Sequence, residues 1–216
     1  MASRNETLRI IREVGVVPVV RAESKEEALK IVQAILAGGV NILEITMTVP
    51  GAIQVMERLA DEFGDKVLLG AGTVLDAETG RAAILAGAEF VVSPSTDLSL
   101  IQLCRRYSKP VMPGALTPTE VVYAWQSGAD IVKIFPCGNV GGPAYIRALR
   151  GPLPHIEMIP TGGVDLSTTA DFIKAGAVAV CVGSALVDKK AVKAGKLEVL
   201  TQNASKFVEL VKGARK

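Results

Sequence analysis

The sequence predicts an α/β fold in which parallel strands close into a (β/α)8 barrel, also called a TIM barrel. Two observations predict it: one phrase recurs along the chain, and apolar strand patterns alternate with helical patterns. The phrase is a helical pattern that ends in a small residue and a glycine, followed by an apolar strand. It occurs at Ala37-Gly38-Gly39, Ala86-Gly87-Ala88, Ser127-Gly128-Ala129 and Ala175-Gly176-Ala177. Glycine suits these helix ends because it adopts at low cost the left-handed backbone conformation that reverses the chain.

Eight apolar segments have the pattern of β-strands, with roughly one βα unit per 25 residues. They span residues 15–20, 40–45, 67–72, 90–92, 111–114, 131–135, 158–161 and 178–182. An open, doubly wound sheet would also alternate strands with helices, but the repeated phrase and the count of eight favour a closed barrel. No linker interrupts the chain, so we expect residues 1–216 to form a single domain.

The segments between the strands show helical periodicity. Helices are predicted over residues 25–36, 52–63, 77–85, 98–107, 119–126, 144–149, 168–174 and about 198–214, and a short amphipathic helix is predicted within residues 1–13. Several of them follow residues that commonly cap a helix N-terminus, namely Ser24, Asp76, Thr117 and Ser167. Pro118 matches the preference of proline for the first helical position.

The composition is that of a globular protein. Apolar residues make up 49% of the 216 residues and charged residues 21%, without a long run of one sign. The net charge of +2 and the lack of a basic cluster interleaved with aromatic residues argue against a nucleic-acid partner. No apolar stretch is long enough to span a membrane, and the N-terminal segment lacks the apolar core of a signal peptide.

The cysteines and the histidine limit the chemistry further. Cys104, Cys137 and Cys181 are far apart and odd in number, which fits a reducing, cytoplasmic setting. The sequence has one histidine, His155, so a metal cannot be held by a histidine cluster, and a serine–histidine pair would depend on that residue. The lack of a histidine cluster argues against such a metal site, and we expect neither a metal nor a cofactor.

Lys133 lies within an apolar strand pattern, Ile131-Val132-Lys133-Ile134-Phe135. Side chains alternate between the two faces of a strand, so Lys133 shares a face with Ile131 and Phe135 and is expected to point into the barrel. Burial costs an ammonium its hydration and favours the neutral amine, which can attack a ketone carbonyl. A structural ion pair inside the barrel would explain the same position.

Glu44 occupies a similar position in Ile42-Leu43-Glu44-Ile45-Thr46, on one face with Ile42 and Thr46. A carboxylate in the same cavity as Lys133 could form an ion pair with that lysine. It could also transfer protons between solvent, substrate and imine, because a partly desolvated glutamate with a raised pKa suits general acid–base work. The sequence does not separate these two roles, and one residue can perform both.

Two further polar residues end predicted strands, where the active sites of barrels lie. Arg21 ends the first strand and offers a planar fork for a carboxylate, although a surface residue at the start of a loop would look the same. Thr73 ends the third strand and could donate a hydrogen bond to a ligand or simply cap the next helix.

Glycines follow the seventh and eighth strands, in Thr161-Gly162-Gly163 and Gly183-Ser184. Glycine lets backbone N–H groups face an anion, and barrels commonly bind phosphate with these two loops. Tight turns without a ligand are the alternative. Both motifs at the expected strands predict a phosphate site that includes Gly162, Gly163 and Ser184.

An ordered set of motifs resembles one known family. The set is Leu43-Glu44-Ile45-Thr46, Gly70-Ala71-Gly72-Thr73-Val74, Ser93-Pro94, Pro113-Gly114, Lys133-Ile134-Phe135-Pro136, Pro160-Thr161-Gly162-Gly163 and Val182-Gly183-Ser184. From about residue 14 to residue 187 the sequence resembles the 2-keto-3-deoxy-6-phosphogluconate (KDPG) and 4-hydroxy-2-oxoglutarate aldolases. The resemblance implies a metal-free class I aldolase that is usually a homotrimer and that acts on a phosphorylated 2-oxo acid.

The resemblance also implies roles for individual residues. Lys133 would form the Schiff base with the C2 ketone, and Glu44 would transfer protons. Thr73, Pro94 and Phe135 would line the pyruvate half of the site, and Gly162, Gly163 and Ser184 would hold the phosphate. The expected products of KDPG are pyruvate and glyceraldehyde 3-phosphate, and the galactonate epimer and 4-hydroxy-2-oxoglutarate are further candidate substrates.

The chain departs from the family pattern at Thr48, where some members have an arginine that helps to hold the substrate carboxylate. Other relatives place an arginine at the end of the first strand, as Arg21 is placed here, so we expect Arg21 to bind the carboxylate. Two other functions are compatible with a phosphate-binding barrel. A phosphate-binding barrel without lyase activity would leave the burial of Lys133 and Glu44 unexplained, and a ribulose-phosphate epimerase would need metal-binding histidines that this chain lacks.

Overall fold

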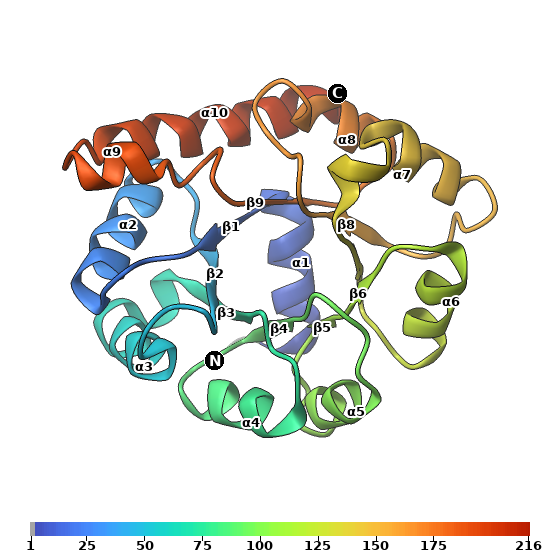
Figure 1. Ribbon diagram of the computed structural model, residues 1–216, viewed down its shortest axis with the longest axis horizontal. Helices are drawn as coiled ribbons and strands as arrows, with labels where there is room; N and C mark the ends of the chain where they lie inside the picture. Colours follow the sequence, from blue (N-terminus) through green and yellow to red (C-terminus); the bar gives the residue numbers. More distant parts are fainter. Residues whose placement is uncertain (1–2) are drawn as a thin grey trace.

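A computed structural model describes residues 3–216 as a ring of parallel strands surrounded by helices (Figure 1). The strands are β1 Val16–Val20, β2 Ile42–Thr46, β3 Leu68–Gly72, β4 Phe90–Val92, β5 Val111–Met112, β6 Gly114–Ala115, β7 Val132–Ile134, β8 Met158–Pro160 and β9 Val180–Val182. Six strands pair in the order β5-β4-β3-β2-β1-β9 and three in the order β6-β7-β8. These strands agree with the predicted ones within a few residues at each end.

The two sheets form one closed barrel. β5 and β6 are the halves of a single strand that Pro113 interrupts, because proline has no N–H to donate to a ladder. A parallel bridge between Thr161 and Cys181 joins the end of β8 to β9. The prediction of a closed barrel is thereby confirmed over the open, doubly wound sheet.

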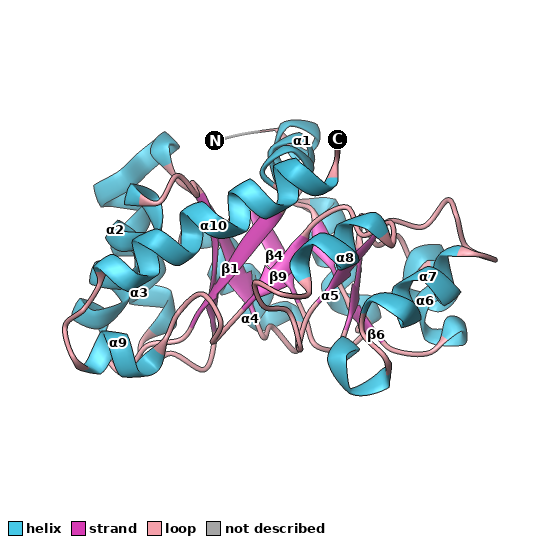
Figure 2. Cartoon of the chain, turned by 90° about the horizontal axis from the view of Figure 1, so that it is seen from above, coloured by secondary structure: helices cyan, strands magenta, loops and turns pink. Residues whose placement is uncertain are grey.

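The helices lie outside the ring, apart from α1 (Figures 1 and 2). They are α1 Arg4–Val14, α2 Lys25–Ala37, α3 Ala52–Phe63, α4 Ala77–Leu85, α5 Leu98–Arg106, α6 Pro118–Gln126, α7 Pro143–Arg150, α8 Thr169–Lys174, α9 Lys189–Lys193 and α10 Glu198–Ala214. Short 3-10 helices, η1 Gly64–Lys66 and η2 Cys137–Val140, add two turns. The sequence did not predict α9, η1 or η2, since pieces of three to five residues are too short to show a period.

Three of the four predicted caps are confirmed. The side chains of Ser24, Asp76 and Thr117 accept backbone N–H groups at the starts of α2, α4 and α6. The prediction for Ser167 is wrong. The Asp165 carboxylate accepts the N–H groups of Ser167 and Thr168 and holds both in a turn, so that α8 begins after Thr168.

Helix α1 covers the end of the barrel where the strands begin. Gly15 follows α1 in a left-handed conformation, with φ of 70°, and leads directly into β1. Two ion pairs fix the helix to the far side of the ring: Arg4 pairs with Asp130, and Arg12 pairs with Glu157 at 2.8 Å. Because this end is covered, a substrate has to enter the ring from the carboxyl ends of the strands. No helix within residues 3–216 is both long enough and apolar enough to cross a bilayer.

The strand register shows which side chains face the inside of the ring. Partners in a parallel ladder point to the same face. Glu44 is paired with Val19 on one side and Gly70 on the other, and Lys133 is paired with Gly114 and Ile159. A Cβ atom at Gly70 would lie 2.1 Å from the Phe90 ring, so Phe90 fills the ring interior beside Gly70.

Candidate active site

Lys133 and Glu44 both project into the ring and are both buried. Lys133 is 5% exposed and Glu44 is fully buried. The Lys133 Nζ lies 5.3 Å from the centre of the Phe135 ring, which places the amine toward the carboxyl end of its strand. The alternation that the sequence predicts for this strand therefore holds at Lys133 and Phe135.

Glu44 has an unusual environment for a carboxylate. Neither of its oxygens has a hydrogen-bond partner among residues 3–216, and no ion pair joins it to Lys133. Burial raises the pKa of Glu44, and the positive charges of Lys133 and Arg21 oppose that rise. The structural ion pair that the sequence left open is not formed. The Glu44 carboxyl is instead left without a hydrogen-bond partner, in the same interior as the Lys133 amine.

Glycines on the strands next to β2 and β7 leave room for the Glu44 side chain and for the loop that carries Pro94. A Cβ atom at Gly72 would lie 1.7 Å from Glu44 Oε1, so the glutamate side chain lies across the end of β3. A Cβ atom at Gly114 would lie 2.1 Å from the carbonyl oxygen of Pro94. The loop after β4 therefore packs closely on the strand that pairs with Lys133.

Three of the predicted pyruvate-binding residues end neighbouring strands. Thr73 follows β3 with φ of 58°, a left-handed conformation that is strained for a β-branched residue, and its side chain is partly buried. Pro94 follows β4 and Phe135 follows β7, and both are partly buried. Strain of this kind is characteristic of functional sites, which supports a ligand-binding reading of Thr73 over a helix cap. The cap of α4 is Asp76.

Arg21 and Thr48 line one small cavity of about 170 Å³ beyond the end of β1. Arg21 is exposed, yet its charge reaches Glu44 and opposes the rise in pKa that burial causes in that carboxyl. The hydroxyl groups of Thr48 and Thr46 are 2.7 Å apart. Since Arg21 and Thr48 line one cavity, an arginine at either position could reach a substrate carboxylate bound there.

The predicted phosphate-binding residues lie in the loops after β8 and β9. Gly162 and Gly163 have φ of 85° and 74°, so both are in conformations that glycine adopts freely. Within residues 3–216, no acceptor takes the backbone N–H groups of Gly162, Gly163 or Ser184 in the loops. The bridge between Thr161 and Cys181 brings the two loops side by side. Unused N–H groups from two adjacent loops are what an anion site needs.

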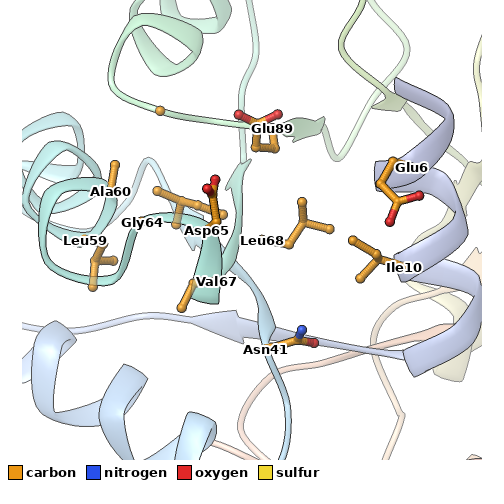
Figure 3. A pocket seen from close by; sticks show the side chains of 12 residues that line it. Glu6, Ile10, Asn41, Leu59, Ala60, Gly64, Asp65, Val67, Leu68 and Glu89 are labelled. Atoms are coloured by element: carbon orange, nitrogen blue, oxygen red, sulfur yellow. The ribbon is translucent and has the colours of Figure 1, made fainter. Parts of the chain in front are cut away.

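Sequence reasoning did not select Thr161 or Cys181, which are also buried on the inner face of the ring. Strand alternation places Thr161 on the same face as Ile159, and Cys181 on the same face as Gly183, so the sequence pattern was enough to predict that both point inward. Threonine and cysteine are common in buried strands, however, and neither residue suggested a function. A cavity of about 440 Å³ at the opposite rim is separate from this site. Figure 3 shows its lining, which combines α1 side chains such as Glu6 and Ile10 with Asn41, Leu68 and Glu89.

Comparison with known proteins agrees with this geometry. The model of the KDPG and KHG aldolase family matches residues 8–203. The chain belongs to this family. It is 34% identical over 201 residues to the 2-dehydro-3-deoxy-phosphogluconate aldolase of Treponema pallidum, covering 93% of this chain and 95% of the relative.

Two further comparisons concern substrate and mechanism. The 2-dehydro-3-deoxy-6-phosphogalactonate aldolase of Escherichia coli is 34% identical over 200 residues, covering 92% of this chain and 95% of the relative. The structure of KDPG aldolase from Legionella pneumophila holds pyruvate captured as a covalent carbinolamine. It matches with a TM-score of 0.85 and 28% identity, covering 92% of this chain and 96% of that one. The chain is thus an aldolase, a carbon–carbon lyase, and the comparisons give no support to a non-lyase barrel.

Proposed function

We propose that this protein cleaves 2-keto-3-deoxy-6-phosphogluconate to pyruvate and glyceraldehyde 3-phosphate through a Schiff base on Lys133. The observation that carries the proposal is a buried lysine and a buried, unpaired glutamate on the inner face of one closed ring. Burying two ionisable groups without a mutual ion pair costs stability, so their retention indicates a use in chemistry. The galactonate epimer and 4-hydroxy-2-oxoglutarate are further candidate substrates.

In the proposed reaction, the Lys133 amine attacks the C2 ketone, and the carbinolamine that forms takes a proton from the Glu44 carboxyl and loses water, which gives an iminium and the Glu44 carboxylate. The iminium accepts the electron pair of the C3–C4 bond while the Glu44 carboxylate removes the proton of the C4 hydroxyl. Glyceraldehyde 3-phosphate leaves. The enamine that remains on Lys133 is protonated at C3, and hydrolysis releases pyruvate and the free amine.

The raised pKa of Glu44 suits this task. A carboxyl whose pKa lies closer to neutral both accepts and returns a proton more readily than an exposed one. The positive charge of the iminium would form near Glu44 and would favour its ionised form at the moment when a base is needed. Among the described residues, two other carboxylates are largely buried, and both have cationic partners: Glu89 pairs with Lys109, and Asp130 pairs with Arg4.

The substrate would lie across the carboxyl ends of the strands. Arg21 would bind its carboxylate with a fork of N–H donors. The pyruvate half would rest among Thr73, Pro94 and Phe135. The phosphate would accept the unused N–H groups of Gly162, Gly163 and Ser184. This order places the C2 ketone between the two ends of the molecule, within the ring and near Lys133.

We further propose a single-domain, cytoplasmic protein that assembles as a homotrimer. One continuous cluster of buried apolar residues supports a single domain. Buried, unpaired Cys104, Cys137 and Cys181 fit a reducing compartment. Exposed apolar side chains on the outside, such as Leu75, Leu85 and Leu98, support an association between copies. Light scattering during size-exclusion chromatography would measure the number of subunits.

The function is tested by reducing the protein with borohydride in the presence of pyruvate and measuring its mass. We expect a stable pyruvyl adduct in the parent and none in Lys133→Ala. Lys109→Ala is the matched control, because Lys109 is also largely buried but pairs with Glu89 outside the ring. That variant should still form the adduct. Normal trapping by Lys133→Ala would overturn the assignment of the nucleophile.

Substrate preference is tested by measuring pyruvate release from the two phosphorylated C4 epimers and from 4-hydroxy-2-oxoglutarate. We expect the gluconate form to give the highest kcat/KM. A higher value for the galactonate form would correct the substrate and leave the Schiff-base mechanism intact.

A further inference from the structure

Cys181 lies on the inner face of the ring, on the arc that joins the two proposed catalytic residues. Going round the barrel, β9 is separated from β2 by β1 alone and from β7 by β8 alone. Cys181 is paired with Val17 on β1 and bridged to Thr161 after β8. Its side chain therefore belongs to the wall between Glu44 and Lys133, on the same face as both.

The thiol in this wall is buried and uncharged. Cys181 is 1% exposed. Burial raises the pKa of the thiol to about 12, with a further contribution from the Glu44 charge, while Lys133 and the Thr161 hydroxyl act in the opposite direction. A thiol is a weak hydrogen-bond donor and behaves as a small apolar group. It leaves both oxygens of Glu44 without a hydrogen bond.

We propose that Cys181 is a positioning residue for the aldol reaction, because its apolar thiol closes the wall beside Glu44 and withholds from that carboxyl the hydrogen bonds that would fix its charge. The inference rests on the proposed function of Glu44. A hydroxyl at this position would be a stronger donor and would favour bound water in the wall. Either change would stabilise the carboxylate relative to the protonated acid.

The other charges around Glu44 are accounted for. Lys133 on β7 and Arg21 at the end of β1 are the charged groups that act on its pKa, and both favour the ionised form. Thr46 on β2 and Thr161 after β8 are buried polar residues of the ring interior, and their hydroxyls carry no charge. The Thr46 hydroxyl is engaged with Thr48 and the Val20 carbonyl. Position 181 is thus a place where one atom can change the environment of Glu44 without changing the number of charges.

The test compares Cys181→Ser with Cys181→Val, because serine replaces sulfur with a hydroxyl and valine is apolar and of similar size. The readout that does not depend on activity is the pH titration of the Glu44 carboxyl carbon by NMR, with the resonance assigned by its loss in Glu44→Gln. The second readout is the acid limb of kcat/KM, which reports the base of the free enzyme. Cys104→Ser is the matched control, since Cys104 is equally buried but lies on α5, outside the ring.

We expect Cys181→Ser to lower the Glu44 midpoint and the acid limb by about one pH unit, as one added hydrogen bond to a carboxylate would. Cys181→Val should leave both unchanged or raise them, and Cys104→Ser should move neither. No shift in Cys181→Ser, or an equal downward shift in Cys181→Val, would overturn the inference.

The outcome is separable from the proposed function. If Glu44→Gln removes the acid limb while Cys181→Ser does not shift it, Glu44 is the base and Cys181 has no influence on it. If the acid limb persists in Glu44→Gln, the role of Glu44 itself is wrong. Should Cys181→Ser not fold, the valine variant still decides, because a lowered midpoint in that variant contradicts the proposed role.

Discussion

Gly72→Ala offers a steric test of where Glu44 acts. The added Cβ would lie 1.7 Å from Oε1 of Glu44, 2.3 Å from its Cδ and 2.4 Å from its Cγ. These three contacts span the outer half of the side chain, so a rotation of the carboxyl group alone cannot relieve them. The glutamate has to leave its position across the end of β3, which moves the carboxylate away from the site of proton transfer.

The expected size of the effect follows from two terms. General acid–base catalysis contributes roughly 10²- to 10⁴-fold, so kcat should fall by about 10- to 1000-fold if the displaced carboxylate retains part of its action. Overpacking a buried position costs about 1–3 kcal/mol, which for a chain of this length lowers Tm by roughly 2–12 °C. Pyruvate should still be trapped on Lys133 by borohydride, because the amine is untouched.

The assay is pyruvate release coupled to NADH oxidation, together with thermal unfolding. Gly213→Ala is the control, because a Cβ at Gly213 in α10 meets nothing within 4 Å. It should leave kcat unchanged and stabilise the protein by up to about 1 kcal/mol. In a Glu44→Ala background, Gly72→Ala should cost little more activity, since the group it displaces is gone. A Gly72→Ala variant with parental kcat would refute the catalytic role of the observed Glu44 position.

Three further predictions concern the remaining parts of the site. Arg21→Ala should weaken pyruvate binding by roughly 10- to 1000-fold, with partial recovery in Arg21→Lys and with inhibition by phosphate retained. Unchanged pyruvate binding would show that Arg21 is a surface residue without a role in the site. Gly163→Ala, whose Cβ would lie 2.6 Å from the Gly138 Cα, should raise KM for phosphorylated substrate far more than for a non-phosphorylated 2-oxo acid, and equal losses would indicate a folding role. Glu44→Gln should raise Tm at pH 8, because the pKa of Glu44 is raised in the folded protein, so ionising this carboxyl costs stability as pH rises above its ordinary pKa of 4.5. The gain in Tm should vanish at lower pH, where Glu44 is protonated, and a gain that is the same at every pH would contradict the raised pKa.

Periodicity was sufficient to predict most of the fold. Strand alternation placed Lys133 and Glu44 on the inner face, since a one-residue error would have put charged groups under the helices. Closure of the ring followed from the number of units, because eight βα units fit a barrel better than an open sheet. The caps Ser24, Asp76 and Thr117 could be found because each accepts the N–H group of the residue three positions along the chain.

The remaining features depend on contacts that are distant in sequence. The Asp165 carboxylate, and not the Ser167 hydroxyl, accepts the backbone N–H groups ahead of α8. Aspartate and serine side chains both accept backbone N–H groups in local turns of this kind, so the sequence alone does not decide between them. The clash that would arise at Gly72 requires knowing that Glu44 crosses from β2 to β3. Cys181 looks like an ordinary core residue until the closed ring places it between Glu44 and Lys133.

The lack of a partner for Glu44 is best understood as a consequence of how the ring is filled. The strands place apolar or small side chains around the carboxylate, with Val19 and Gly70 as its ladder partners and Gly72 beneath it. A hydrogen-bond donor at any of these positions would stabilise the fold and would also hold the carboxylate in its charged form. The protein is less stable for the absence of that donor. In return, Glu44 is left free to exchange a proton with whatever is bound to Lys133, and substrate is the partner that the interior otherwise lacks.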